Sequence, residues 1–291
     1  MNSFQNKTIL ITGGTGSFGK KFLNEILNNN SNFKKIIILS RDELKQSQMQ
    51  EEFIKHKKKI RYFLGDIRDK ERLRSAFENV DIVVHAAALK QVPAAEYNPI
   101  EFIKTNILGA QNIIEVALEK NVNKVIALST DKASAPVNLY GATKLCSDKL
   151  FLAANNFSGG RKTIFSVLRY GNVMMSRGSV IPLFNQQIKN GGPITVTDPE
   201  VTRYFMSIPE AVGLVLEASS MSEDGDKFIL NMGKKIKILD IAKKMIKLAG
   251  YKNKLDNKNG DIDIKFIGLR PGEKLHEDLT LGENFLNTEN K

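Results

Sequence analysis

Two pairs of acid–base residues follow one short apolar run in the middle of the chain. The run Val125–Ser129 predicts a buried strand, and Asp131 and Lys132 come directly after it. Tyr140 and Lys144 follow four residues apart, so both side chains share one face if a helix begins near Tyr140. A lysine ammonium beside the phenol would lower the pKa of Tyr140 by stabilising the phenolate. We therefore expect this connection to carry proton-transfer chemistry.

Strand-like and helix-like segments alternate through the first part of the chain and would position these groups. The predicted strands are Thr8–Thr12, Ile36–Ser40, Ile60–Leu64, Ile82–His85, Val125–Ser129 and Ile164–Arg169. The predicted helices between them include Phe18–Asn28, Glu71–Phe77, Glu101–Lys120 and Tyr140–Asn156. This alternation predicts an α/β fold of Rossmann type, with a doubly wound parallel sheet. Ligands of such folds bind in the crevice at the carboxyl edge of the sheet.

The pattern becomes less regular after about Gly171. Short strand-like pieces at Ile194–Thr197 and Phe228–Asn231 are mixed with predicted helices at Ile208–Ser220 and Ile238–Ala249. We expect residues 1–172 to form a dinucleotide-binding domain. Residues 173–291 would form a smaller, mainly substrate-binding region, with some segments returning to the sheet.

A glycine-rich loop connects the first predicted strand to the first predicted helix. Gly14, Gly16 and Gly19 satisfy G-x-G-x-x-G, and Gly13 begins an overlapping G-x-x-G-x-x-G. Glycines let the backbone approach a pyrophosphate, and the helix that follows supplies N–H groups at its positive end. The alternative is a glycine-rich turn without a ligand, but the flanking strand and helix favour a dinucleotide.

The end of the second predicted strand bears on which dinucleotide binds. An acidic residue there would hold the ribose 2′-hydroxyl of NAD, whereas an arginine accommodates the 2′-phosphate of NADP. Ser40 and Arg41 come first, with Lys45 one turn later, and this order favours NADP. Asp42 keeps NAD open, and the same residues could simply begin a capped helix.

Two further strand ends are suited to a cofactor. Asp66 follows the third predicted strand, where it could meet an adenine edge. Ala86, Ala87 and Ala88 follow the fourth, where small side chains would let the backbone lie close to the cofactor or pack tightly against a helix.

The composition narrows the class of protein. The 291 residues are 42% hydrophobic and 26% charged, which is ordinary for a globular enzyme. A net charge of +11 comes from scattered lysines, so we expect anionic small ligands and no nucleic acid. No apolar run approaches the ~18 residues of a membrane span, and Met1–Lys7 is too polar for a signal peptide. The single cysteine, Cys146, fits a cytoplasmic location, and the three histidines share no metal-ligand spacing.

Taken together, these residues resemble the extended short-chain dehydrogenase/reductase superfamily. The likeness is carried by the glycine loop, Asp66, Ala86–Ala88, Asn106, Ser129–Thr130, and Tyr140 with Lys144. Residues 129–132, 138–144, 169–173, 177–182 and 269–277 look like nucleotide-sugar 4,6-dehydratases acting on UDP-N-acetylglucosamine. They are most similar to the configuration-inverting enzymes that open the pseudaminic acid pathway. Dehydratases of dTDP-glucose and GDP-mannose characteristically carry Asp-Glu where this chain has Asp131-Lys132.

The resemblance implies which residues bind each ligand. For NADP it implies Gly13, Thr15, Gly16, Ser17, Phe18, Gly19, Ser40, Arg41, Lys45, Asp66, Ile67, Ala86, Ala87, Ala88, Asn106, Ser129, Tyr140, Lys144, Tyr170, Asn172 and Val173. For the UDP-sugar it implies Lys90, Thr130, Asn172, Arg177, Val180, Thr195, Arg203, Arg270 and Glu273. Arg177 and Arg270 suit a diphosphate, because guanidinium forks match phosphate oxygens. Glu273 could accept a hydrogen bond from a ribose hydroxyl, and Arg203 could equally form a surface ion pair.

The resemblance also implies a reaction. Tyr140 would take the proton of the sugar C4 hydroxyl as hydride leaves C4 for NADP, with Thr130 bonding the C4 oxygen and Asn106 helping to order Lys144. Neutral Lys132 would remove the C5 proton, and protonated Asp131 would help the C6 hydroxyl leave as water. Hydride then returns to C6, and protonation of C5 from the opposite face inverts that centre.

Several alternatives stay open from the sequence. The segment Ile208–Tyr251 looks closer to configuration-retaining dehydratases, and the nucleotide could be GDP. A nucleotide-sugar 4-epimerase would share the glycine loop and the Tyr140–Lys144 pair. A non-catalytic NADP sensor would commonly lack the tyrosine. The superfamily usually dimerises through two long helices, here Glu101–Lys120 and Tyr140–Asn156, so we expect a homo-oligomer.

Overall fold

A seven-stranded sheet forms the centre of the chain. The structure is a computed structural model that describes residues 4–28, 32–160, 162–176, 178–222 and 225–280. The strand order is β11-β6-β5-β4-β1-β2-β3, and every pairing in this sheet is parallel. Its strands are β1 (Thr8–Thr12), β2 (Lys35–Ser40), β3 (Ile60–Leu64), β4 (Ile82–His85), β5 (Lys124–Leu128), β6 (Ile164–Arg169) and β11 (Lys227–Ile229).

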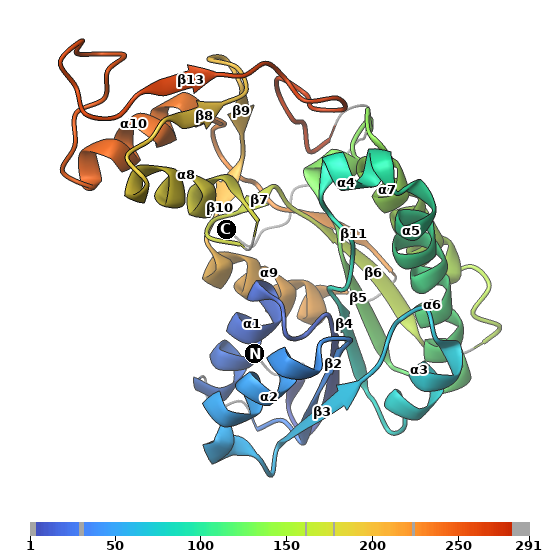
Figure 1. Cartoon of the computed structure of the whole chain (residues 1–291). Helices are drawn as coiled ribbons and strands as arrows, with labels where there is room; N and C mark the ends of the chain where they lie inside the picture. The colour runs from blue at the N-terminus through green and yellow to red at the C-terminus, as the bar shows by residue number, and fades with distance from the viewer. Residues whose placement is uncertain (1–3, 29–31, 161, 177, 223–224, 281–291) are drawn as a thin grey trace.

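Helices cover both faces of this sheet (Figure 1). One face carries α1 (Ser17–Asn28), α2 (Glu43–Glu52) and α9 (Ile208–Met221). The other carries α3 (Lys70–Ala76), α5 (Pro99–Phe102), a π-helical turn (Ile103–Leu108), α6 (Gly109–Glu119) and α7 (Leu139–Ala154), with α4 (Val92–Tyr97) beside α7. Successive side chains of a strand point to opposite faces, so Leu10 enters one apolar cluster while Ile9 and Ile11 enter the other. Burial on both faces explains the continuous apolar runs of these strands.

A smaller region follows the carboxyl end of β6 and has its own apolar core. Three two-stranded pairings join β7 (Asn172–Val173) with β10 (Phe205–Met206), β8 (Ile194–Val196) with β13 (Ile264–Phe266), and β9 (Thr202–Arg203) with β12 (Ile236–Lys237). The helices α8 (Val180–Lys189) and α10 (Ile238–Leu248) pack against each other. Phe184, Ile188, Ile194 and Ile246 are buried together in this core. Two segments of the same half, β11 and α9, belong instead to the seven-stranded unit.

The predicted fold class is confirmed. The first six predicted strands match the observed ones to within one residue at each end. The helix expected at Glu101–Lys120 is present as α5 and α6, which a π-helical turn joins, and α2 is the capped helix that the sequence left as an alternative at Asp42. Single π turns inside helices are frequent at functional sites. Within the described ranges, no helix has the length and apolar character needed to span a membrane.

Candidate active site

The glycine-rich loop lies where the strand order reverses, between β1 and β4. The Thr12 hydroxyl accepts hydrogen bonds from the backbone N–H groups of Ala86 and Ala87, each at 3.1 Å. Gly13 has φ +65°, and a Cβ there would lie 2.9 Å from the Cα of Ala87. The close approach of these two turns therefore requires glycine at position 13. This crevice is where open α/β sheets bind dinucleotides.

The loop fits a pyrophosphate. It ends at Ser17, the first residue of α1, whose first turn contains no acidic residue. The unsatisfied N–H groups and the dipole of a helix N-terminus attract anions. Gly16 closes the turn with its N–H 2.9 Å from the carbonyl oxygen of Gly13, while Thr15 is buried and Phe18 stacks on Phe22.

The end of β2 presents one exposed cation. Asp42 caps α2, and its carboxylate also forms an ion pair with Lys45. Ser40 is buried and its hydroxyl accepts a hydrogen bond from Gln46 at 3.0 Å. The Arg41 side chain is 52% exposed, with its guanidinium 3.7 Å from a carboxylate oxygen of Asp66.

Asp66 and Ile67 follow β3. Burial opposes ionisation of Asp66, but hydrogen bonds from Arg68 outweigh it and lower the pKa of that carboxyl. Ile67 is buried in the core, and its carbonyl accepts from the Asn112 side chain at 3.0 Å. An ionised Asp66 therefore lies within reach of Arg41 at the crevice.

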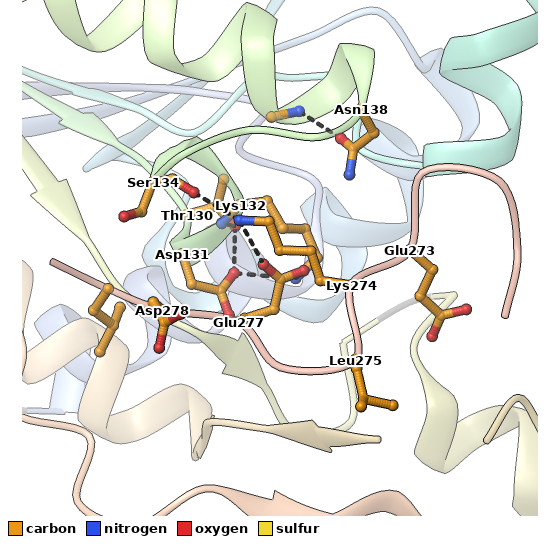
Figure 2. Close-up of polar contacts among 12 residues, drawn as sticks. Thr130, Asp131, Lys132, Ser134, Asn138, Glu273, Lys274, Leu275, Glu277 and Asp278 are labelled. Carbon is orange, nitrogen blue, oxygen red and sulfur yellow. Dashed lines mark hydrogen bonds and ion pairs between the residues drawn. The ribbon is translucent and has the colours of Figure 1, made fainter. Parts of the chain in front are cut away.

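The Asp131–Lys132 pair lies in a short 3-10 helix, Asp131–Ala133, that follows β5 (Figure 2). Asp131 is fully buried, and its Oδ1 accepts hydrogen bonds from the Lys132 Nζ and the Thr130 hydroxyl, both at 3.0 Å. The Lys132 Nζ also lies 3.5 Å from the Asn172 Oδ1. The structure thus brings Thr130, Asp131 and Asn172 together around the Lys132 ammonium.

Tyr140 and Lys144 lie on one buried face of α7. Asn138 caps this helix, its Oδ1 accepting from the Gly141 N–H at 2.8 Å. Lys144 donates to the Leu128 carbonyl at 2.7 Å, and burial lowers the pKa of its ammonium although Asp148 opposes this. Burial raises the pKa of the Tyr140 phenol, and a hydrogen bond with Thr130 only partly offsets it. The lowering of this pKa by Lys144, which the sequence predicted, is therefore wrong: the Lys144 ammonium is directed to the Leu128 carbonyl, and desolvation of the phenol dominates.

Neighbouring buried polar groups complete this face. Burial, reinforced by the charge of Lys144, lowers the pKa of His85 to about 3, so the ring is neutral. Asn106, in the π-helical turn, bonds both backbone groups of Leu89 at 2.9 Å and the Thr143 hydroxyl at 3.0 Å. Its described contacts thus join the loop after β4 to α7 beside Lys144. Ser129 donates to Asp148 at 2.7 Å, and Tyr170, which follows β6, is half-buried.

Most of the predicted sugar-nucleotide residues come from the smaller region. Arg203 is buried and pairs with Glu273, with 3.0 Å between the guanidinium and the Oε1. The Glu273 Oε2 accepts from the Arg270 backbone N–H at 3.2 Å, while Arg270 itself is exposed. The remaining members are placed as follows: Lys90 is exposed after β4, Val180 begins α8, Thr195 in β8 accepts from the Gln187 side chain, and Arg177 lies outside the described residues. Val173, predicted for the cofactor, is in β7.

One charged group of the site was not predicted. Glu277 is buried, and its Oε1 lies 3.7 Å from the Lys132 Nζ. Burial raises the pKa of this carboxyl, and Lys132 opposes the shift. Residues 269–277 were part of the resemblance to nucleotide-sugar dehydratases. Glu277 itself could not be singled out, because its partner Lys132 is far away in sequence.

The fold and the site define a class of protein. A dinucleotide loop at the switch point, with Thr130, Tyr140 and Lys144 at the neighbouring strand end, is the arrangement of an extended short-chain dehydrogenase/reductase.

Comparison with known proteins gives the family within this class. Residues 9–291 match the family described as Polysaccharide biosynthesis protein, and the chain belongs to that family. It is 51% identical over 277 residues to UDP-N-acetylglucosamine 4,6-dehydratase (inverting) of Campylobacter jejuni subsp. jejuni serotype O:2, covering 94% of this chain and 77% of the relative. It is 44% identical over 284 residues to UDP-glucose 4-epimerase of Rickettsia prowazekii, covering 97% and 80%.

A solved structure agrees with the fold. The X-ray structure of Pen from Bacillus thuringiensis superposes with a TM-score of 0.88 at 44% identity, covering 95% of this chain and 83% of that one. The protein is thus an enzyme of the nucleotide-sugar dehydratase and epimerase type.

Proposed function

We propose that the protein catalyses the NADP-dependent 4,6-dehydration of UDP-N-acetylglucosamine with inversion at C5. The product is UDP-2-acetamido-2,6-dideoxy-β-L-arabino-hexos-4-ulose. The observation that carries this proposal is the ion pair between the buried Asp131 and the half-buried Lys132, beside Thr130 and Tyr140. A 4-epimerase needs proton transfer only at the C4 oxygen, whereas elimination needs a second acid and base. The name of the Campylobacter relative supports the same reaction.

The residues of the chain divide the work between two centres. Bound NADP would accept hydride from C4 and return it to C6. Tyr140 acts as the base that takes the proton of the C4 hydroxyl. Lys132, as the neutral amine, takes the C5 proton, and Asp131, as the acid, gives its proton to the departing C6 hydroxyl. Water leaves, and C5 takes a proton from solvent on the opposite face, while Lys132 later returns the abstracted proton to solvent.

The preference for NADP over NAD rests on Arg41. It is the half-exposed cation at the end of β2, while Lys45 is paired with Asp42. A guanidinium suits a 2′-phosphate because its fork of donors matches phosphate oxygens. Arg270, whose backbone N–H donates to Glu273, would bind the diphosphate of the substrate from the smaller region.

The homo-oligomer that the resemblance implies is also part of this proposal. Tyr97, Ile100 and Leu108 are large apolar side chains exposed on or beside α4 and α5. Exposed apolar groups on neighbouring elements support a protein interface there. Light scattering of the purified protein measures the oligomeric state, and a monomer would contradict this part of the proposal.

The reaction is tested by incubating the protein with UDP-N-acetylglucosamine in D₂O and following the sugar by NMR. We expect a 4-keto-6-deoxy product with deuterium at C5 and inverted configuration there. An unchanged C6 hydroxymethyl group with epimerised C4 would instead establish a 4-epimerase, and NADP binding without turnover would favour a sensor. Lys132→Ala should abolish elimination and keep NADP binding. Loss of NADP binding in this variant would show that Lys132 has a different role.

A further inference from the structure

Glu277 is a carboxylate that the reaction scheme above leaves unused. It lies on the segment after β13, which returns from the smaller region to the turn that carries Asp131 and Lys132 (Figure 2). Only 1% of its surface is exposed. Burying a carboxylate costs several kcal/mol unless it is well paired, and such pairs seldom add net stability. Stabilisation of the fold therefore does not explain why a carboxylate is buried at position 277.

The surroundings of Glu277 are charged on several sides. The Lys132 Nζ is 3.7 Å from its Oε1, and the Lys274 Nζ is 3.8 Å from its Oε2. Lys274 is itself held by the Ser134 carbonyl at 2.9 Å. Asp131 and Arg203 also act on it electrostatically, with opposite signs. Two of these groups, Lys132 and Asp131, belong to the elimination.

The hydrogen bonds within this cluster are incomplete. Among the described residues, the Asp131 Oδ2 and the Glu277 Oε2 have no hydrogen-bond partner although both atoms are buried. Such orphaned oxygens are rare in folded proteins, and each calls for an explanation. Here the two carboxylates lie on either side of the Lys132 ammonium, at 3.0 Å and 3.7 Å. Asp131 serves as the acid of the proposed elimination, and Glu277 remains as the carboxylate that contacts Lys132.

We propose that Glu277 is the positioning residue for Lys132 in the elimination step. Its negative charge holds the amine in place and stabilises the ammonium that forms when Lys132 takes the C5 proton. Before this step the three groups are a neutral amine, a protonated Asp131 and a Glu277 carboxylate. After it they are an ammonium and two carboxylates, because Asp131 has given its proton to the C6 oxygen. The cluster keeps its net charge while the bonds from C5 to hydrogen and from C6 to oxygen break.

This inference rests on the proposed dehydration, so the wild-type enzyme is assayed first in D₂O. Absence of elimination by the wild type would refute the proposed function before Glu277 is tested. The next measurement compares Glu277→Gln with Asp278→Asn. Asp278 is the adjacent carboxylate and pairs with Lys235 at 2.6 Å, not with Lys132, so it is a matched control.

Two steps are followed separately in each variant. Oxidation at C4 is measured by nicotinamide absorbance in a single turnover, and proton removal at C5 by deuterium exchange. We expect Glu277→Gln to slow C5 exchange about 10²-fold, as misplacement of a reacting group by ~1 Å does, while C4 oxidation changes less than about threefold. Asp278→Asn should leave both rates near those of the wild type.

The pH dependence separates a positioning role from a packing role. Because Glu277→Gln removes a charge 3.7 Å from the Lys132 Nζ, the pH profile of C5 exchange should be displaced from that of the wild type. Glu277→Asp keeps the charge and should recover part of the exchange rate with the wild-type profile. The inference is overturned if Glu277→Gln keeps both the rate and the profile. It is also overturned if C4 oxidation and C5 exchange fall together, or if Asp278→Asn has the same effect.

Discussion

At Gly141, the start of α7 packs directly against the turn that carries Asp131 and Lys132. Gly141 follows Tyr140 in the first turn of α7, and a Cβ at this position would lie 2.2 Å from the Lys132 carbonyl oxygen and 3.0 Å from the Pro136 Cβ. Ordinary van der Waals contact at such a position begins at 3.4 Å. A Gly141→Ala substitution must therefore separate the start of α7 from the Asp131–Lys132 turn by about 1 Å. The backbone carbonyl cannot rotate away as a flexible side chain would.

The expected cost has two parts with opposite signs. Alanine is favoured over glycine within a helix by about 1 kcal/mol. Overpacking of a buried contact typically costs about 1–3 kcal/mol, and a misplacement of ~1 Å in a site costs about 10²-fold in rate. We thus expect Gly141→Ala to lower the unfolding free energy by about 0–2 kcal/mol and turnover by about 10²-fold.

Gly213 provides the matched control. It lies within α9, and no atom lies within 4 Å of the Cβ that an alanine would add. Gly213→Ala should raise the unfolding free energy by about 0.5–1 kcal/mol and leave turnover unchanged. Both variants are compared by urea denaturation and by product formation. If Gly141→Ala is as stable and as active as Gly213→Ala, the packing of α7 on the Lys132 turn does not require glycine at position 141, and the reasoning is refuted.

Four further predictions concern the site and the helices around it. Asn138→Ala removes the α7 cap and the 2.8 Å bond from its Nδ2 to the Gly272 carbonyl, so unfolding should be easier by about 2 kcal/mol and turnover should fall. Ser207→Ala, a cap on α9, should cost about 1 kcal/mol without loss of turnover. Because the pKa of His85 is lowered to about 3 in the fold, the unfolded chain binds one more proton between about pH 6.5 and 3. As the pH falls through that range, protonation of His85 in the unfolded chain should lower the unfolding free energy of the wild type by about 1.4 kcal/mol per pH unit. His85→Gln should remove this contribution, which urea denaturation at several pH values measures. Arg41→Ala should weaken NADP about tenfold more than NAD in fluorescence titrations, and equal losses would contradict the role given to Arg41.

The sequence predicted the sheet well because its strands are buried on both faces. Thr8–Thr12 and Ile82–His85 are continuous buried runs bounded by polar residues, and their ends needed no tertiary information. Helix α2 was left as an alternative because only Gln46 and Met49 are buried in it, so it shows no apolar stripe. The π-helical turn at Ile103–Leu108 was missed because one additional residue per turn leaves no clear mark on a hydrophobic pattern.

The site divides in the same way. Asp131, Lys132, Tyr140 and Lys144 lie within one connection, so local spacing was enough to group them. Pairs such as Arg203–Glu273 and Lys132–Glu277 join residues far apart in sequence, and a single charged residue carries no periodic signal of its partner. Only the packing of the smaller region against the sheet identifies such pairs.

The return of the segment 270–279 to the sheet has a consequence for the order in which the enzyme becomes competent during synthesis. All seven strands of the central sheet precede residue 230, whereas Gly272 meets Asn138, Glu277 meets Lys132, and the Leu279 carbonyl accepts from Arg169 at 3.1 Å. A nascent chain that has left the ribosome only as far as residue 260 can thus assemble its dinucleotide crevice before residues 270–279 make their contacts with Asn138, Lys132 and Arg169. The dinucleotide crevice and the completed acid–base site then arise at different moments of synthesis, separated by the time needed to translate this last segment.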